Sequence, residues 1–147
     1  MGNLEKQKRR EKIAKLMSEA VINDLAGCDF LYSFDEEYIL AEYNGIGPEF
    51  LPAGVREKVT KYLALFEPAA LIHDMRNAVS DGSRKSFNFA NIEFHENCRK
   101  MADRRYPWWH LRRYLARAAA AFLYDFVCSQ AGWRAWMECH EKLEIRN

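Results

Sequence analysis

Residues 66–91 read FEPAALIHDMRNAVSDGSRKSFNFAN, and this stretch decides the fold. Apolar side chains recur at three- and four-residue steps on both sides of the turn sequence Ser80–Ser83, which predicts two helices joined by a tight turn. His73 and Asn91 each lie nine residues from Gly82. With Gly82 at the turn of an antiparallel pair, the two side chains come level, and we expect Asn91 to hold the His73 imidazole in one orientation.

His73 and Asp74 stand in the middle of the first of these helices, within an apolar run. Adjacent residues of a helix point about 100° apart, so Asp74 is placed to face a metal while His73 faces a substrate beside it. A buried pair of this kind costs desolvation, which favours a functional reason for its presence. The competing interpretation is that both residues belong to a polar face.

The same periodicity predicts helices through the rest of the chain. They are an amphipathic helix within residues 1–27, a helix from Leu51 to Phe66, one opened by Pro68 and running through Val79, one through Phe87–Met101, a long one opened by Pro107 and running to Phe126, and a short one separated from it by Gly132. Residues Phe30–Ala41 are of undecided state. We predict an all-α, single-domain helical bundle over residues 1–147, with a Gly-containing loop before an antiparallel helix pair.

The formal net charge of +1 over 147 residues hides a separation of charge along the chain. Residues 29–49 hold six acids and no Lys or Arg, whereas residues 99–117 hold seven bases and one acid. An acidic patch suits a cation and a basic patch suits a phosphate or an anionic surface. The alternative is that each patch is a solvated face and that the two neutralise each other in the fold.

The four cysteines form no Cys-x-x-Cys motif, and no export signal or run of about 18 apolar residues is present. We therefore expect free thiols and a cytoplasmic protein. A zinc site from His95, Cys98, Cys139 and His140 is the minor alternative.

The loop Tyr43-x-Gly45-x-Gly47 is the first half of a candidate metal site. Closely spaced glycines let a backbone turn several carbonyl oxygens toward one point, and calcium favours such an oxygen cage. A Gly-x-Gly-Pro sequence is also an ordinary turn.

Residues 104–114, RRYPWWHLRRY, interleave bases with aromatic side chains. Trp and Tyr favour the boundary between apolar and aqueous regions, and bases favour anionic headgroups. The candidate membrane or anion surface consists of Arg104, Arg105, Trp108, Trp109, Arg112 and Arg113. The alternatives are a nucleic-acid or protein surface, or a helix start whose tryptophans belong to the core.

Taken in order, these features resemble the phospholipase A2 fold. The chain is most similar to its small, disulfide-poor phage- and bacteria-encoded members, on the strength of Asn44-Gly45, Leu51-Pro52, His73-Asp74 and Ala90-Asn91. The resemblance covers residues 43–97 and extends through the long helix to residue 136. It implies a phage or mobile-element association and a phospholipase A2-like core over residues 43–136.

The resemblance also implies roles for individual residues. Backbone carbonyls of Tyr43, Gly45 and Gly47 and the Asp74 carboxylate would bind Ca²⁺, and His73 would act as general base on a water. Calcium and a loop N–H near Gly45 would stabilise the oxyanion of a lipid ester.

The chain departs from the family pattern near His73. Family members commonly have Asp at the position of Asn91, and an amide adds no negative charge to stabilise an imidazolium. Secreted members also have Cys and Tyr at the positions of Arg76 and Asn77. Asp125 is a candidate for the missing carboxylate.

Three functions follow as hypotheses. The first is a calcium-dependent phospholipase A2-like lipid ester hydrolase, with reduced or lost activity as a variant of it, and the second is a non-catalytic binding or assembly protein on the same fold. A nucleic-acid-binding protein is the third. A metal-dependent phosphohydrolase of the His-Asp domain type needs a further histidine upstream of the pair, and no histidine precedes His73.

Overall fold

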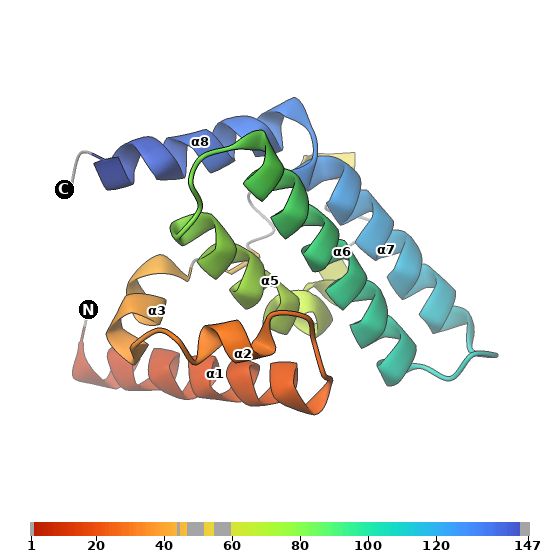
Figure 1. Ribbon diagram of the computed structural model, residues 1–147. Coiled ribbons are helices and arrows are strands. Elements are labelled where there is room, and N and C mark those ends of the chain that lie inside the picture. The colour runs from red at the N-terminus through yellow and green to blue at the C-terminus, as the bar shows by residue number, and fades with distance from the viewer. Residues whose placement is uncertain (1, 44, 47–51, 55–59, 145–147) are drawn as a thin grey trace.

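The chain folds into an all-α structure in which one helix, α5, runs through the centre (Figure 1). A computed structural model describes residues 2–43, 45–46, 52–54 and 60–144, and these residues form helices and no strands. The helices are α1 (Asn3–Ile22), α2 (Cys28–Leu31), α3 (Glu36–Glu42), the 3₁₀-helix η2 (Thr60–Tyr62), α5 (Leu63–Ala78), α6 (Arg84–Arg105), α7 (Leu111–Val127) and α8 (Gln130–Glu144).

Helix α5 is apolar around most of its circumference and therefore needs cover on several sides. It packs against α1, α2, α3, α6 and α8. Phe66, Leu71 and Met75 are fully buried in the main core. His73 and Asp74, the pair that the sequence marks as functional, thus lie on a helix that other helices cover on several sides.

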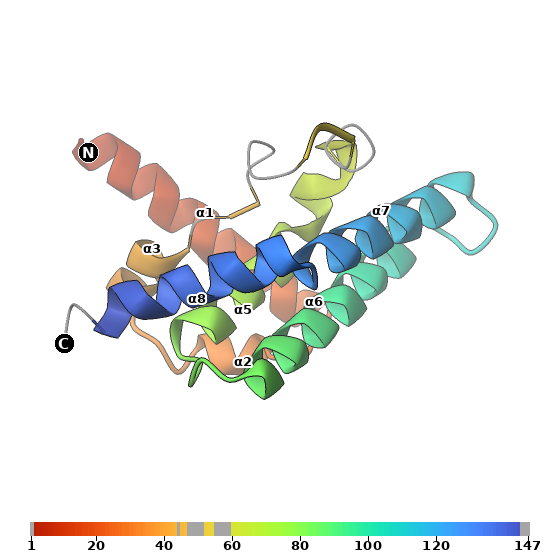
Figure 2. The ribbon, with the colours of Figure 1, turned by 90° about the horizontal axis from the view of Figure 1, so that it is seen from above.

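Helices α6 and α7 form a long antiparallel hairpin whose tip projects from the rest of the molecule (Figures 1 and 2). The predicted turn at Ser80–Ser83 is confirmed: Gly82 has a positive φ of 77°, and the Ser83 side chain accepts the Ser86 N–H at the start of α6. Helix α8 crosses over α5 (Figure 2). Its Trp136 packs with Phe87 of α6 in a second, smaller core.

Three helix boundaries predicted from Pro and Gly are wrong. Pro68 lies inside α5, which already begins at Leu63. Pro107 lies in the turn before α7, where the His110 side chain caps the helix by accepting the Arg112 N–H. Gly132 lies inside α8, and the break between the last two helices comes at Cys128 and Ser129.

The other predicted elements divide into those confirmed and those only partly described. The N-terminal helix is confirmed as α1, and the undecided segment Phe30–Ala41 contains the end of α2 and most of α3. Of the helix predicted from Leu51 to Phe66, residues 53–54 are helical and η2 leads into α5, while 51 and 55–59 are outside the described residues.

The two charged stretches do not neutralise each other among the described residues, which corrects that alternative. Acids of α3 and α5 are paired with bases of α1, through Lys6 and Arg10 with Glu37, and Lys12 with Glu67. The bases of residues 99–117 pair with acids outside the acidic stretch instead. These pairs are Lys100–Asp24, Arg104–Asp24, Arg113–Asp103 and Arg117–Asp103.

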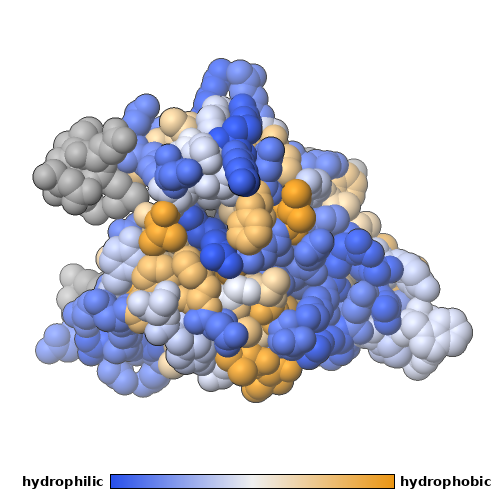
Figure 3. Space-filling view, viewed as in Figure 1, coloured by the Kyte–Doolittle hydropathy of each residue, from blue (hydrophilic) through white to orange (hydrophobic). Residues whose placement is uncertain are grey.

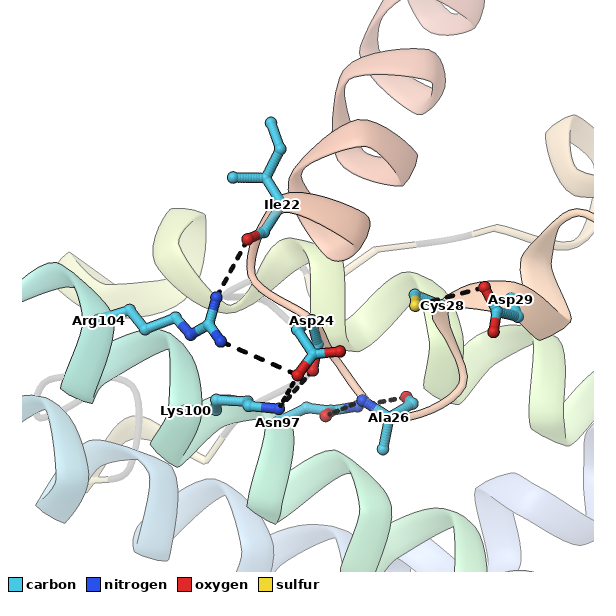
Figure 4. Close-up of polar contacts among 8 residues, drawn as sticks. All are labelled: Ile22, Asp24, Ala26, Cys28, Asp29, Asn97, Lys100 and Arg104. Carbon is cyan, nitrogen blue, oxygen red and sulfur yellow. Dashed lines mark hydrogen bonds and ion pairs between the residues drawn. The ribbon is translucent and has the colours of Figure 1, made fainter.

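Helix α6 holds the connection after α1 through polar side chains (Figure 4). The buried Asn97 accepts the Ala26 N–H at 2.8 Å and donates to the Ala26 carbonyl at 2.9 Å. Lys100 and Arg104 donate to backbone carbonyls of Asp24 and Ile22. Positive charges at the carboxyl end of α1 interact favourably with the helix dipole. Helix α6 therefore both caps α1 and fixes its position.

Removing the Asn97 amide is expected to destabilise the fold. The Asn97→Ala variant removes a buried side chain and both of its hydrogen bonds to the Ala26 backbone, so we expect a loss of about 2 kcal/mol in the free energy of unfolding. Denaturant unfolding measures the loss. Asn88→Ala, an exposed position on the same helix, is the matched control and should change stability by less than about 0.5 kcal/mol. Equal effects in the two variants would contradict the role given to Asn97.

Candidate functional site

The predicted contact between His73 of α5 and Asn91 of α6 is confirmed. His73 Nε2 lies 2.8 Å from Asn91 Oδ1, and Asn91 is fully buried. Asn91 Nδ2 donates to the Val127 carbonyl at the end of α7, at 3.3 Å. Three helices therefore meet at one amide.

This contact determines which nitrogen of His73 carries the proton. A carbonyl oxygen only accepts, so Asn91 must direct its NH₂ group to Val127 and its oxygen to His73. Nε2 is therefore the N–H nitrogen in neutral His73, and Nδ1 carries the lone pair. Burial lowers the pKa of His73, against an opposing effect of the hydrogen bond with Asn91. The imidazole is thus a neutral base at pH 7 with a defined basic atom.

A pocket of about 180 Å³ opens beside this pair. Its polar lining includes His73, Asp74 and Asn91, and its apolar lining includes Phe126 and Trp136. The Trp136 side chain is 3% exposed, and its indole N–H has no hydrogen-bond partner among the described residues. Such an arrangement suits a ligand with an apolar body and a polar group.

Gly132 allows α8 to form the far wall of the pocket. A Cβ at this position would lie 2.1 Å from the Val127 carbonyl oxygen. Any larger residue would force α8 away from the end of α7, where the same carbonyl accepts from Asn91. The glycine read from the sequence as a helix break is therefore a packing requirement inside α8.

Asp74 reaches the predicted loop, as the sequence suggests. The Gly45 N–H donates to Asp74 Oδ2 at 3.2 Å, and Gly45 has a positive φ of 74°. In this arrangement the Gly45 N–H is bound to the carboxylate, so it is not free to stabilise an oxyanion. Gly47 lies outside the described residues.

The Tyr43 carbonyl is not available as a calcium ligand in this arrangement. It accepts the Arg9 guanidinium of α1 at 2.6 Å. Burial and the negative charges of Glu67 and Asp74 raise the pKa of the Tyr43 hydroxyl, which has no hydrogen-bond partner among the described residues. Of the predicted ligands, Asp74 suits calcium, whereas Tyr43 does not fit while Arg9 occupies its carbonyl.

Asp125 does not join the His73 site, which corrects its predicted role. Its side chain is exposed on α7, and it does not line the pocket. Its charge acts on His95, where it opposes the lowering of the pKa by burial and by Arg99. Asn91 is therefore the polar partner of His73 among the described residues.

Sequence reasoning missed a largely buried ion pair between α5 and α6, next to the contact of His73 with Asn91. Arg76 donates to both carboxylate oxygens of Glu93 at 3.0 Å, and its guanidinium lies 4.0 Å from the centre of the Phe30 ring. Gly27, at φ 83°, packs against the same pair. Long-range pairs of this kind leave no local sequence signal beyond the two charges.

The basic-aromatic segment lies at the tip of the α6–α7 hairpin. Trp108 and Trp109 are 72% and 66% exposed, which excludes the interpretation that they belong to the core. Arg104 and Arg113 are held by acidic or carbonyl groups. Arg105 and Arg112 are exposed, and no acid lies within ion-pair distance of either in the described part of the chain.

The zinc alternative finds no support, because no three His, Cys, Asp or Glu side chains cluster for a metal within the described ranges. Among the helices that the structure describes, none combines the length and the apolar character that a bilayer crossing requires.

No protein-family model, curated protein or solved structure matches the chain. The resemblance to phospholipase A2 therefore stays a prediction.

The lowered pKa of His73 has a consequence for stability. The unfolded imidazole binds a proton near its ordinary pKa of 6.5 and the folded one at lower pH. Below pH 6.5 the unfolded state binds more protons, so the free energy of unfolding should fall as the pH falls and level off above that pH. The His73→Gln variant should lose this part of the slope, as measured by denaturant unfolding across pH.

Nitrogen-detected NMR of the imidazole tests the same arrangement directly. We expect an Nε2–H tautomer and a pKa below 6.5 in the wild type. Asn91→Asp should raise this pKa because a carboxylate stabilises the imidazolium, whereas Asn88→Asp, three residues away on the exposed side, should leave it unchanged. An Nδ1–H tautomer would contradict the assigned geometry.

Proposed function

We propose that the protein is a phospholipase A2-like hydrolase of lipid esters. The observation that carries the proposal is the hydrogen bond between His73 Nε2 and Asn91 Oδ1, with the amide itself fixed by Val127. It leaves Nδ1 as a neutral base beside a pocket with apolar and polar walls. The pocket has room for the ester and the first part of an acyl chain of a phospholipid.

The chain's own residues account for the proton transfers of this reaction. A water attacks the ester carbonyl carbon while His73 Nδ1 takes its proton, forming a tetrahedral oxyanion and an imidazolium. Collapse breaks the bond to the glycerol oxygen, which takes the proton back from His73. The products are a fatty acid and a lysophospholipid. Asn91 keeps the ring oriented throughout, with its oxygen facing the Nε2–H.

In this proposal Asp74 is a ligand of calcium. Arg9 has to move away from the Tyr43 carbonyl for the ion to bind there. When bound, the ion would supply Lewis-acid stabilisation of the ester oxyanion. A guanidinium on the Tyr43 carbonyl repels a dication at the same oxygen. The N-terminal helix therefore opposes calcium entry in the described arrangement.

A non-catalytic binding protein on the same fold is the second candidate. Asn91 favours it, because an amide stabilises an imidazolium less than a carboxylate does. The hydrogen bond from Asn91 to Val127 also needs an NH₂ group, which Asp lacks. The geometry of the site therefore depends on the amide. A protein that only binds a ligand would have the same need for an amide at this position.

Fatty acid release from mixed phospholipid vesicles tests the hydrolase. We expect release in the presence of calcium, loss of it with a chelator, and a fall of about a hundredfold or more in His73→Gln, because general base catalysis contributes that much. His95→Gln is the matched control, since His95 stacks on Tyr124 outside the pocket. Equal release from the wild type and His73→Gln would contradict the hydrolase. A wild type without activity that gains it as Asn91→Asp would favour the binding protein.

Calorimetric titration with calcium tests the role of Arg9. Arg9→Met removes the competing charge, so we expect calcium to bind at least about tenfold tighter than to the wild type. Lys8→Met, an exposed neighbour on α1, should leave the affinity unchanged, and Asp74→Asn should abolish binding. Calcium binding that survives in Asp74→Asn would place the ion elsewhere.

A further inference from the structure

The tip of the α6–α7 hairpin carries a surface of large side chains that are exposed to solvent. The hairpin tip is defined here as Arg105 at the end of α6, the turn and the start of α7, with Trp108 at 72%, Leu111 at 69% and Tyr114 at 53% exposed. Trp109 and Leu115 are also exposed large side chains of this surface. Isolated exposed apolar residues are ordinary, but a contiguous group marks an interaction surface.

The hairpin tip is held in shape by its own hydrogen bonds. The Tyr114 hydroxyl donates to the Trp108 carbonyl at 2.8 Å, and the His110 side chain accepts the Arg112 N–H at 3.0 Å. The indoles of Trp108 and Trp109 stay exposed although the backbone beneath them is fixed. A fixed backbone presents them to a partner at a lower entropic cost than a loose one.

The charges of the hairpin tip distinguish between anionic partners. Arg104, Arg113 and Arg117 are engaged by Asp24 or Asp103. Arg105 and Arg112 are the bases at the hairpin tip with no acidic partner within the described residues. A nucleic acid site needs several phosphate contacts for useful affinity. Two available arginines beside five large side chains suit an anionic bilayer surface better, because apolar insertion supplies most of the binding there.

The shape of the molecule agrees with this partner. The hairpin tip projects from the body in both ribbon views (Figures 1 and 2), and it protrudes at the edge of the space-filling view beyond strongly hydrophilic surface (Figure 3). A protruding tip enters a headgroup layer without moving the core. It lies far from the His73 site, because Arg105 follows Asn91 by 14 residues of α6, about 21 Å at 1.5 Å per residue.

We propose that the hairpin tip docks the protein on anionic lipid bilayers by inserting Trp108, Trp109 and Leu111 into the interface, with Arg105 and Arg112 on the headgroups. This docking does not depend on the proposed hydrolysis and holds equally for a non-catalytic protein. The apolar contribution should make binding only moderately sensitive to salt.

Co-sedimentation with vesicles of phosphatidylcholine and phosphatidylglycerol tests the docking. We expect the wild type to bind, with a blue shift of tryptophan emission, and to bind vesicles of phosphatidylcholine alone several-fold more weakly. Trp108→Ser combined with Trp109→Ser should weaken binding at least about tenfold, because each indole loses its burial in the interface. Arg105→Gln combined with Arg112→Gln should remove the preference for the anionic vesicles.

Tyr32→Ser, at a 60% exposed aromatic on the body of the molecule, is the matched control and should bind as the wild type does. Leu111→Ser is a single substitution in the same surface, which keeps the test valid if the double variant misfolds. It should also weaken binding. Three results would overturn the proposal: no binding of the wild type to either vesicle, equal binding by the double tryptophan variant, or a steeply salt-dependent gel shift with duplex DNA that exceeds vesicle binding. Self-association of the wild type without lipid that disappears in the double tryptophan variant would make the hairpin tip a contact between copies, and would overturn it too.

Discussion

The burial of α5 is the constraint on which the rest of the structure depends. A helix apolar around most of its circumference gains stability only when other helices cover it, and each polar group that it carries inward must then find a partner. His73, Asp74 and Arg76 meet this requirement with three different groups. Their partners are Asn91 on α6, the Gly45 backbone and Glu93 on α6. Two of these three contacts, those of His73 and Asp74, also build the candidate site.

Both ends of the Asn91 amide are used in hydrogen bonds that an amide alone can make. It accepts from His73 and donates to Val127, and Val127 in turn lies against Gly132 of α8. A carboxylate at this position would stabilise an imidazolium. It would also place a carboxylate oxygen against the Val127 carbonyl oxygen, and neither atom can donate a hydrogen bond. The chain thus keeps a neutral, oriented histidine at the expense of charge stabilisation. Hydrolysis and ligand binding both use a neutral, oriented imidazole, so the difference between them lies in the proton transfer.

The sequence predicts the local part of this arrangement and misses the long-range part. The spacing around Gly82 predicted the contact of His73 with Asn91, because a tight turn fixes the register of the two helices that it joins. Proline and glycine misled wherever tertiary packing overrode their local preference, as at Pro68 inside α5 and Gly132 inside α8. There the buried apolar face of the helix outweighs the loss of one backbone hydrogen bond or the conformational freedom of glycine.

Contacts between distant segments account for what remained unpredictable. Asn97 binds the backbone of Ala26 across 71 positions, and Arg9 binds that of Tyr43 across 34. In each case one partner is a backbone group that every residue possesses, so no residue pattern marks it. The Arg9 contact also places a positive charge at an oxygen that the loop sequence predicts as a calcium ligand. The loop sequence alone could predict a ligand set but not the side chain that competes for it.

The two proposals together restrict how the molecule would lie on a membrane. The hairpin tip and Asn91 stand about 21 Å apart along α6. If α6 stood upright on its tip, the pocket beside His73 would be held well above the headgroups, and a phospholipid would have to leave the bilayer to reach it. With α6 lying along the surface, both its ends stay at the interface, and an acyl chain has a shorter path to the pocket. Docking and hydrolysis are therefore compatible only if the hairpin tip inserts at a shallow angle, with the pocket side of the hairpin facing the lipid.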